Sequence, residues 1–89
     1  MSRIHWRLVY ANSARRDLRR LDRPIRDRIL DALERLADHG PESGTLVKLK
    51  GRSGARLRVG DWRVIVELDA LNRAIRVKRV LPRGRAYER

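Results

Sequence analysis

Residues 55–64 read ARLRVGDWRV, and this stretch decides how the chain folds. Apolar residues alternate with arginines on both sides of Gly60-Asp61, and a Gly-Asp pair between two alternating runs predicts a two-residue β-hairpin turn. In such a hairpin Arg58 lies directly opposite Arg63. Like charges facing each other destabilise a sheet, so we expect this arginine-bearing face to be exposed.

The alternation also predicts which hairpin residues are buried. The residues with the phase of a core face are Leu57, Val59, Trp62, Val64, Val66 and Leu68. The opposite face carries Arg56, Arg58, Arg63, Ile65 and Glu67. Trp62 has two interpretations, an anchor at the edge of the core or a platform on which a base stacks.

The N-terminal half predicts one strand followed by two helices. Residues 4–10 alternate as a strand does, and Asn12 or Ser13 is a suitable N-cap for a first helix. Pro24 fits the first turn of a second helix, which Gly40-Pro41 should end. The short break between the two helices predicts a helical hairpin.

The second half predicts a sheet. Residues 40–54 read as a loop or a short strand, and the hairpin strands follow at 55–59 and 62–68. A last strand is expected at 74–81, where the alternation changes phase and predicts a bulge near Lys78–Arg79. The order β-α-α-β-β-β indicates a single α+β domain over the whole chain of 89 residues, with a two-helix hairpin packed on a mainly antiparallel twisted sheet.

The charge of the chain predicts a polyanionic partner. The net charge is +12, and 20 of the 23 basic residues are Arg, whose planar fork suits phosphate. Residues 11–39 hold eight basic and six acidic residues (+2), whereas residues 51–89 hold eleven and four (+7), so the excess lies on the sheet half. The chain has no Cys and no apolar run long enough to cross a membrane, which predicts a cytoplasmic protein that does not associate with membranes.

No cofactor or metal site is expected. His5 and His39 lie far apart in the sequence and suit no metal-ligand spacing. The stretch LKGRSG lacks the spacing and the lysine of a phosphate-binding loop. The acidic residues of the helices, Asp17 among them, are interpreted as helix surface.

Four segments together resemble the RelE/ParE superfamily of bacterial toxins: LDRPIRDRILDALERL, LKG, RLRVGDWRVIVEL and the terminal PRGRAY. The similarity extends from the first strand to Tyr87. It implies a RelE-like microbial RNase fold and the toxin of a type II toxin–antitoxin system. RelE-like members are ribosome-dependent endoribonucleases that need no metal, whereas ParE-like members inhibit DNA gyrase. We expect the RelE-like activity, with gyrase inhibition as the alternative and plain nucleic-acid binding as a third possibility.

The resemblance also implies site residues. Its catalytic set corresponds here to Arg58, Arg63, Arg83 and Tyr87. Phosphate binding is expected from Lys48, Lys50, Arg56 and Arg85. In this scheme the ribose 2′-OH attacks the adjacent phosphate, and Arg58 and Arg63 hold that phosphate. Arg83 stabilises or helps to protonate the leaving oxygen, and Tyr87 activates the 2′-OH or stacks on a base.

Two differences from RelE-like relatives bear on proton transfer. Relatives often carry Lys on the strand before the turn, where this chain has Arg56 and Arg58, and His before the terminal Arg, where this chain has Pro82. Arg does not act as a base, so either the proton-transfer role falls more heavily on Tyr87, or the enzyme is slower or depends in part on groups of the ribosome. The partners implied are mRNA, the ribosome and an antitoxin whose acidic segment wraps the toxin, with operator DNA contacted only through the antitoxin.

Overall fold

The computed structural model describes residues 5–41, 46–49 and 54–84. Its elements follow the order β1 (Arg7–Tyr10), α1 (Asn12–Arg19), α2 (Arg23–His39), β2 (Leu46–Lys48), β3 (Gly54–Val59), β4 (Trp62–Asp69) and β5 (Ala74–Pro82). The five strands form one sheet in the order β1-β5-β4-β3-β2, in which only β1 and β5 pair in parallel. The expected α+β architecture on a mainly antiparallel sheet is confirmed. Residues 40–54, expected to form a loop or a short strand, contain the edge strand β2.

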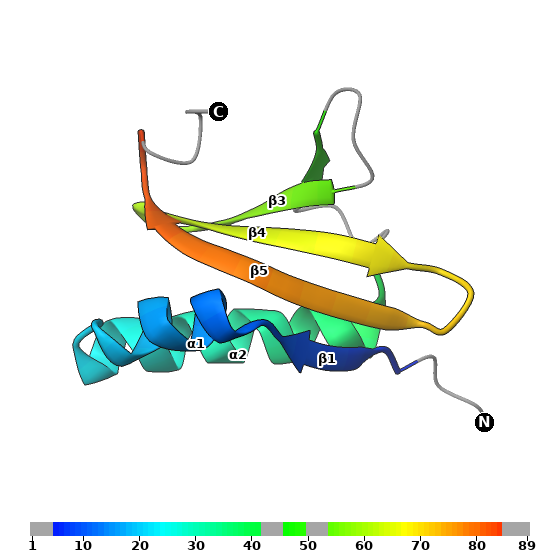
Figure 1. Ribbon diagram of the computed structural model, residues 1–89, viewed down its shortest axis with the longest axis horizontal. Coiled ribbons are helices and arrows are strands. Elements are labelled where there is room, and N and C mark those ends of the chain that lie inside the picture. The colour runs from blue at the N-terminus through cyan, green and yellow to red at the C-terminus, as the bar shows by residue number, and fades with distance from the viewer. Residues whose placement is uncertain (1–4, 42–45, 50–53, 85–89) are drawn as a thin grey trace.

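The two helices cover one face of the curved sheet and leave the other face uncovered (Figure 1). The core lies between these layers, where the fully buried residues of α2 and the sheet include Ile29, Leu33, Val64 and Ile75. The last residues of β5 bend away from the helices, toward the uncovered side (Figure 1). We call the uncovered side the open face. None of the described helices is both long and apolar enough to span a bilayer.

The hairpin forms as its sequence predicts. Arg58 pairs with Arg63 and Val59 with Trp62, so Gly60 and Asp61 are the two turn residues. Gly60 has φ +58° and Asp61 has no positive φ, which matches a type II′ turn with glycine at its first central position. The predicted core face is confirmed, because its residues are either buried or packed against the buried cluster.

The helices begin and end for local reasons. Pro24 lies in the first turn of α2, and Gly40, at φ +86°, ends that helix with its N–H donating to the Leu36 carbonyl at 2.8 Å. The expected N-cap of α1 at Asn12 or Ser13 is wrong: the cap residue is Ala11, and no side chain caps the helix. The Ser13 hydroxyl instead donates to the carbonyl of Lys78 at 2.8 Å.

Candidate nucleic-acid interface

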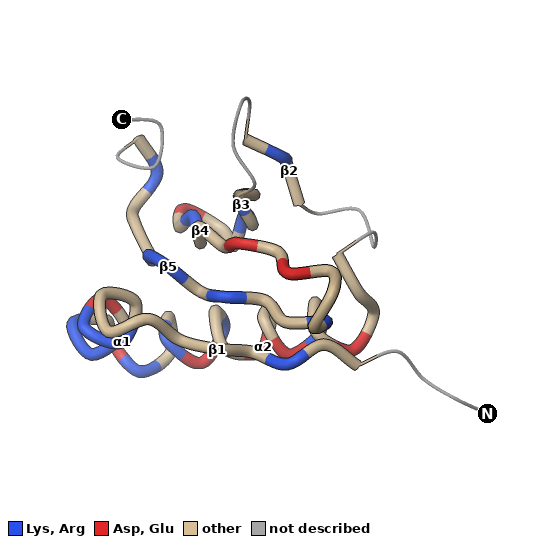
Figure 2. Tube along the Cα trace, turned by 45° about the vertical axis from the view of Figure 1, so that its right-hand side comes forward, with Lys and Arg blue, Asp and Glu red and all other residues tan. Residues whose placement is uncertain are grey.

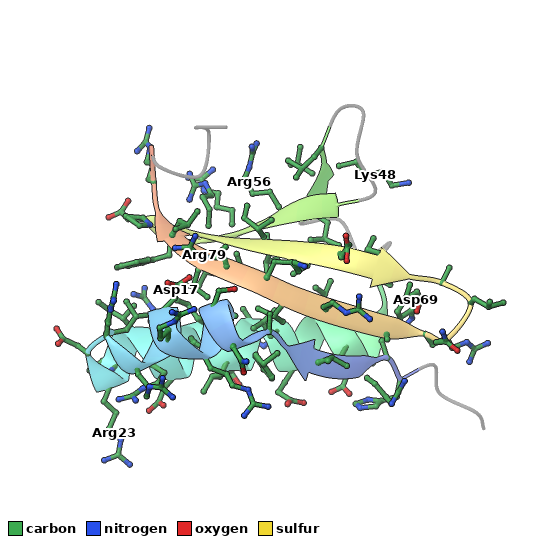
Figure 3. The ribbon with its side chains drawn as sticks, viewed as in Figure 1. Asp17, Arg23, Lys48, Arg56, Asp69 and Arg79 are labelled. Carbon is green, nitrogen blue, oxygen red and sulfur yellow. The ribbon has the colours of Figure 1, made fainter. Side chains whose placement is uncertain are left out.

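The open face takes its arginines from the alternation of β3. Ala55 and Leu57 are buried in the core, so Arg56 and Arg58 project from the opposite side of the strand. Arg56 points away from the helices (Figure 3). Across the sheet, Arg58 pairs with Arg63 of β4, and Arg63 pairs with Leu81 of β5.

Arg63 differs from the expectation of an exposed side chain, because it is only 5% exposed. Its Nη1 donates to the carbonyl oxygens of Gly60 and Trp62, both at 3.0 Å. These bonds turn the guanidinium toward the hairpin turn and join it to the carbonyls on either side of Asp61. Arg63 therefore fixes the turn, and Arg58 is left as the exposed arginine of the facing pair.

The start of the C-terminal tail is held at the same turn. The backbone N–H of Arg83 donates to the carbonyl of Asp61 at 2.7 Å, directly after Pro82 pairs with Trp62. This bond ties the backbone of Arg83 to the turn end of the open face, the end that also carries Arg58, and the Arg83 side chain is exposed there. Two of the predicted catalytic residues, Arg58 and Arg83, therefore lie at the same end of the sheet, and Arg63 pairs with Arg58 in the strand between them.

The other predicted site residues fall elsewhere. Lys48 pairs with Ala55, so the register puts it on the face opposite to Arg56, and the two side chains point in different directions in Figure 3. The structure does not bring Lys48 together with the arginines of the open face. Three residues of the expected set, Lys50, Arg85 and Tyr87, lie outside the described residues.

Charge is not uniform along the open face. At the end remote from the hairpin turn, Arg76 forms an ion pair with Glu67 (Nη1 to Oε1, 3.6 Å). Basic residues continue along β5 toward the turn end (Figure 2). Glu67 offsets the charge of Arg76, whereas at the turn end the exposed Arg58 and Arg83 outnumber Asp61, the one carboxylate that the structure describes there. The turn end therefore keeps a net positive charge for an anion.

A contact that the sequence did not predict closes the edge of β5. As expected, β5 has a bulge: Ile65 pairs with Arg79 and Val66 with Val77, which leaves Lys78 as the extra residue. β1 has ended at this point, and Asp17 of α1 takes its place, accepting hydrogen bonds from the backbone N–H of Val80 (2.8 Å) and from Arg79 (Nε 2.8 Å, Nη2 3.3 Å). Asp17 and Arg79 face each other between α1 and β5 in Figure 3.

This contact lowers the pKa of the Asp17 carboxyl. Burial alone would raise that pKa, but the hydrogen bonds from Arg79 and Val80 and the positive charges of Arg79 and Arg20 outweigh burial. The same bond raises the pKa of Arg79. The interpretation of Asp17 as helix surface is therefore wrong. The sequence shows only that Ser13 and Asp17, four residues apart, share one side of the helix, and not which element that side meets.

Two helices packed on one face of a five-stranded mixed sheet match the fold of solved RelE toxins. The family described as the ParE toxin of type II toxin–antitoxin systems, parDE, matches residues 8–87. The chain belongs to this family and is the toxin of a type II toxin–antitoxin system.

Solved structures agree with this assignment. The toxin–antitoxin complex RelBE2 from Mycobacterium tuberculosis matches with a TM-score of 0.77 and 20% identity over 91% of this chain and 94% of that one. The RelE–RelB complex from Pyrococcus horikoshii matches with a TM-score of 0.76 and 26% identity over 91% and 98%. The RelB–RelE complex from Methanococcus jannaschii matches with a TM-score of 0.72 and 27% identity over 89% of this chain and 94% of that one. Among curated protein sequences, none matches the chain.

Proposed function

We propose that this toxin is a RelE-like endoribonuclease that cuts mRNA on the ribosome at the turn end of the open face. The observation that carries the proposal is that Arg58 and Arg83 lie at one end of the open face. At the other end, Glu67 neutralises the charge of Arg76. Two exposed guanidinium groups, one on β3 and one directly after β5, can bind one phosphate from two sides. The likeness to the RelE proteins of Pyrococcus horikoshii and Methanococcus jannaschii, at 26% and 27% identity, supports the RelE-like assignment.

The proposed reaction uses the RNA itself as nucleophile. The 2′-oxygen attacks the adjacent phosphorus, the bond to the 5′-oxygen breaks, and the proton of the 2′-OH is balanced by a proton delivered to the leaving oxygen. Charge on the phosphorane-like transition state grows where Arg58 and Arg83 lie, and their fixed positive charge stabilises it. Neither arginine can act as the base, so we assign activation of the 2′-OH to Tyr87.

The buried Arg63 has a different role in this proposal. Its guanidinium is bonded to the carbonyls of Gly60 and Trp62, so it acts on the site by fixing the turn to which Arg83 is tied. Arg63 is then a positioning residue. Arg56, further from the turn on β3, is proposed to contact the RNA backbone beside the cleaved phosphate, and Arg85 is proposed to do so from the tail.

Controlled expression followed by mapping of mRNA 5′ ends tests the proposal. The exposed residues are changed singly, as Arg58→Gln and Arg83→Gln, and Arg23→Gln is the matched control because Arg23 lies on α2, away from the open face (Figure 3). Loss of a group that stabilises the transition state typically lowers the rate by about 10²–10³-fold. We expect both open-face variants to lose the cuts and the growth arrest, and Arg23→Gln to keep them. Full cleavage by either open-face variant contradicts the site.

A second candidate function has one observation in its favour, which is that the matching family is described as ParE toxin. ParE-like inhibition of DNA gyrase requires no reactive phosphate site. It predicts loss of supercoiling by purified gyrase and a DNA-damage response in cells, with mRNA left intact. That pair of results would replace the ribonuclease proposal.

The partner proposed for either activity is an antitoxin with an acidic segment, since each of the three complexes above pairs a toxin of this fold with an antitoxin. An acidic segment lying over the open face would neutralise Arg58 and Arg83 and exclude RNA. The ribosome is the second proposed partner, and the cytoplasm is the compartment in which both are met.

A further inference from the structure

A second arginine site lies between α1 and the C-terminal half of β5, outside the open face. It is a hollow of about 240 Å³ lined by Ser13, Arg16, Asp17, Arg20 and Arg79. Every lining side chain is polar or charged, and three of the five are arginines. We call it the α1–β5 hollow.

Its charge is only partly balanced from within. Asp17 is bonded to Arg79 and to the backbone N–H of Val80, so its negative charge is already offset. Arg16 and Arg20 are exposed, stand one helical turn apart, and take part in no ion pair within the described part of the chain. Three arginines against one aspartate leave the α1–β5 hollow with a net charge of +2.

The opposite flank of α1 provides a contrast. There Arg15 and Arg19, also four residues apart, border a hollow of about 400 Å³ whose other lining residues are Tyr10, Leu18 and Leu30. That hollow has an apolar floor, as protein-docking surfaces do. The α1–β5 hollow has no such floor, so little apolar surface would be buried by a protein segment placed in it.

We propose that the α1–β5 hollow binds backbone phosphate of an RNA strand, as a contact separate from the cleavage site. Arginine forks match phosphate geometry, and only two of the five N–H groups of Arg79 are bonded to Asp17. β5 connects the two sites, because Arg83 follows Arg79 by four residues, a distance of roughly 13 Å along an extended strand. One RNA strand can therefore contact both. The choice of RNA rests on the proposed function, whereas the anion site rests on the arginines alone.

The test compares two pairs of arginines on α1 and its C-cap residue, Arg20. The variant Arg16→Gln/Arg20→Gln removes the pair in the hollow, and Arg15→Gln/Arg19→Gln removes the same charge at the same spacing on the other flank. Gln has nearly the helix propensity of Arg, and circular dichroism verifies that both fold. The probe is a fluorescent 12-nucleotide 2′-O-methyl RNA, which cannot be cleaved through its 2′-oxygen, and binding is measured by anisotropy across salt concentrations.

We expect Arg16→Gln/Arg20→Gln to bind the RNA roughly tenfold more weakly at low salt. The slope of log affinity against log salt should fall by about 1.4, which corresponds to two lost phosphate contacts on a single strand. Arg15→Gln/Arg19→Gln should keep the wild-type slope.

Equal losses in the two variants would mean a general charge effect and would overturn the proposal. So would an unchanged slope in Arg16→Gln/Arg20→Gln, a loss confined to a duplex DNA probe of the same length, or a loss confined to an acidic peptide of poly-glutamate. Because the probe is not cleavable, failure here is distinct from failure of the cleavage assay with Arg58→Gln and Arg83→Gln, which would count against the proposed function.

Discussion

Replacing Asp17 tests whether one side chain holds α1 to the bulge of β5. In Asp17→Ala the backbone N–H of Val80, a residue that is 2% exposed, loses its acceptor. An unsatisfied buried donor costs about 1–3 kcal/mol, and the lost ion pair with the half-exposed Arg79 adds about 0–1 kcal/mol. We therefore expect the free energy of unfolding to fall by about 1–4 kcal/mol. Asp17→Asn keeps an acceptor for Val80 and should lose only about 1 kcal/mol.

Urea denaturation followed by tryptophan fluorescence measures these changes. Asp31→Asn is the control, because Asp31 forms an exposed ion pair with Arg35 at 3.4 Å, and removing it should change stability by less than about 0.5 kcal/mol. If Asp17→Ala were as stable as Asp31→Asn, the hydrogen bond to Val80 would contribute nothing and the reasoning would be wrong.

The pH dependence gives an independent check. Because the pKa of Asp17 is lowered in the folded protein, its contribution is present above the ordinary value of 3.8 and is lost as the pH falls through the folded pKa. The wild type should lose stability in this acid range more steeply than Asp17→Asn. Equal slopes for the two proteins would show that the pKa of Asp17 is not lowered by folding.

Three further changes probe the hairpin and the core. Arg63→Met removes the bonds to the carbonyls of Gly60 and Trp62 and should destabilise the protein by about 1–3 kcal/mol in urea; wild-type stability would show that Arg63 does not fix the turn. Gly60→Ala meets no atom within 4 Å but must adopt φ near +58°, so we expect a cost of about 1–2 kcal/mol, visible as a lower Tm. Leu33→Ala removes a fully buried side chain and should cost about 2–5 kcal/mol; a loss below this range would mean that the core refills the space.

The parts of the fold that local sequence determines were predictable. Alternation and the Gly60-Asp61 pair are enough to define the hairpin register, and the change of phase near Lys78 revealed the bulge. β2 was ambiguous because three residues are too few to show a period. Its pairing with β3 depends on the sheet already being present.

The candidate site was less predictable because side-chain direction depends on distant partners. The arginine-bearing face of the hairpin follows from alternation, but nothing in the sequence shows that Arg63 bends back to the turn while Arg58 does not. Likewise, Ser13 and Asp17 bond to residues 65 and 63 positions away, so no local rule assigns them. The hydroxyl of Ser13, expected to cap its own helix, donates instead to a carbonyl of β5.

The closed edge of β5 also affects how the toxin behaves before it meets a partner. β1 ends at Tyr10, so the part of β5 after Val77 would present a row of free N–H and C=O groups at the edge of the sheet. A strand from another molecule can pair with such an edge and begin aggregation. The Ser13 hydroxyl donates a hydrogen bond to the carbonyl of Lys78, and the Asp17 carboxylate accepts one from the N–H of Val80. A short helix thus protects the sheet with two polar side chains, in a small chain with little other surface to cover that edge.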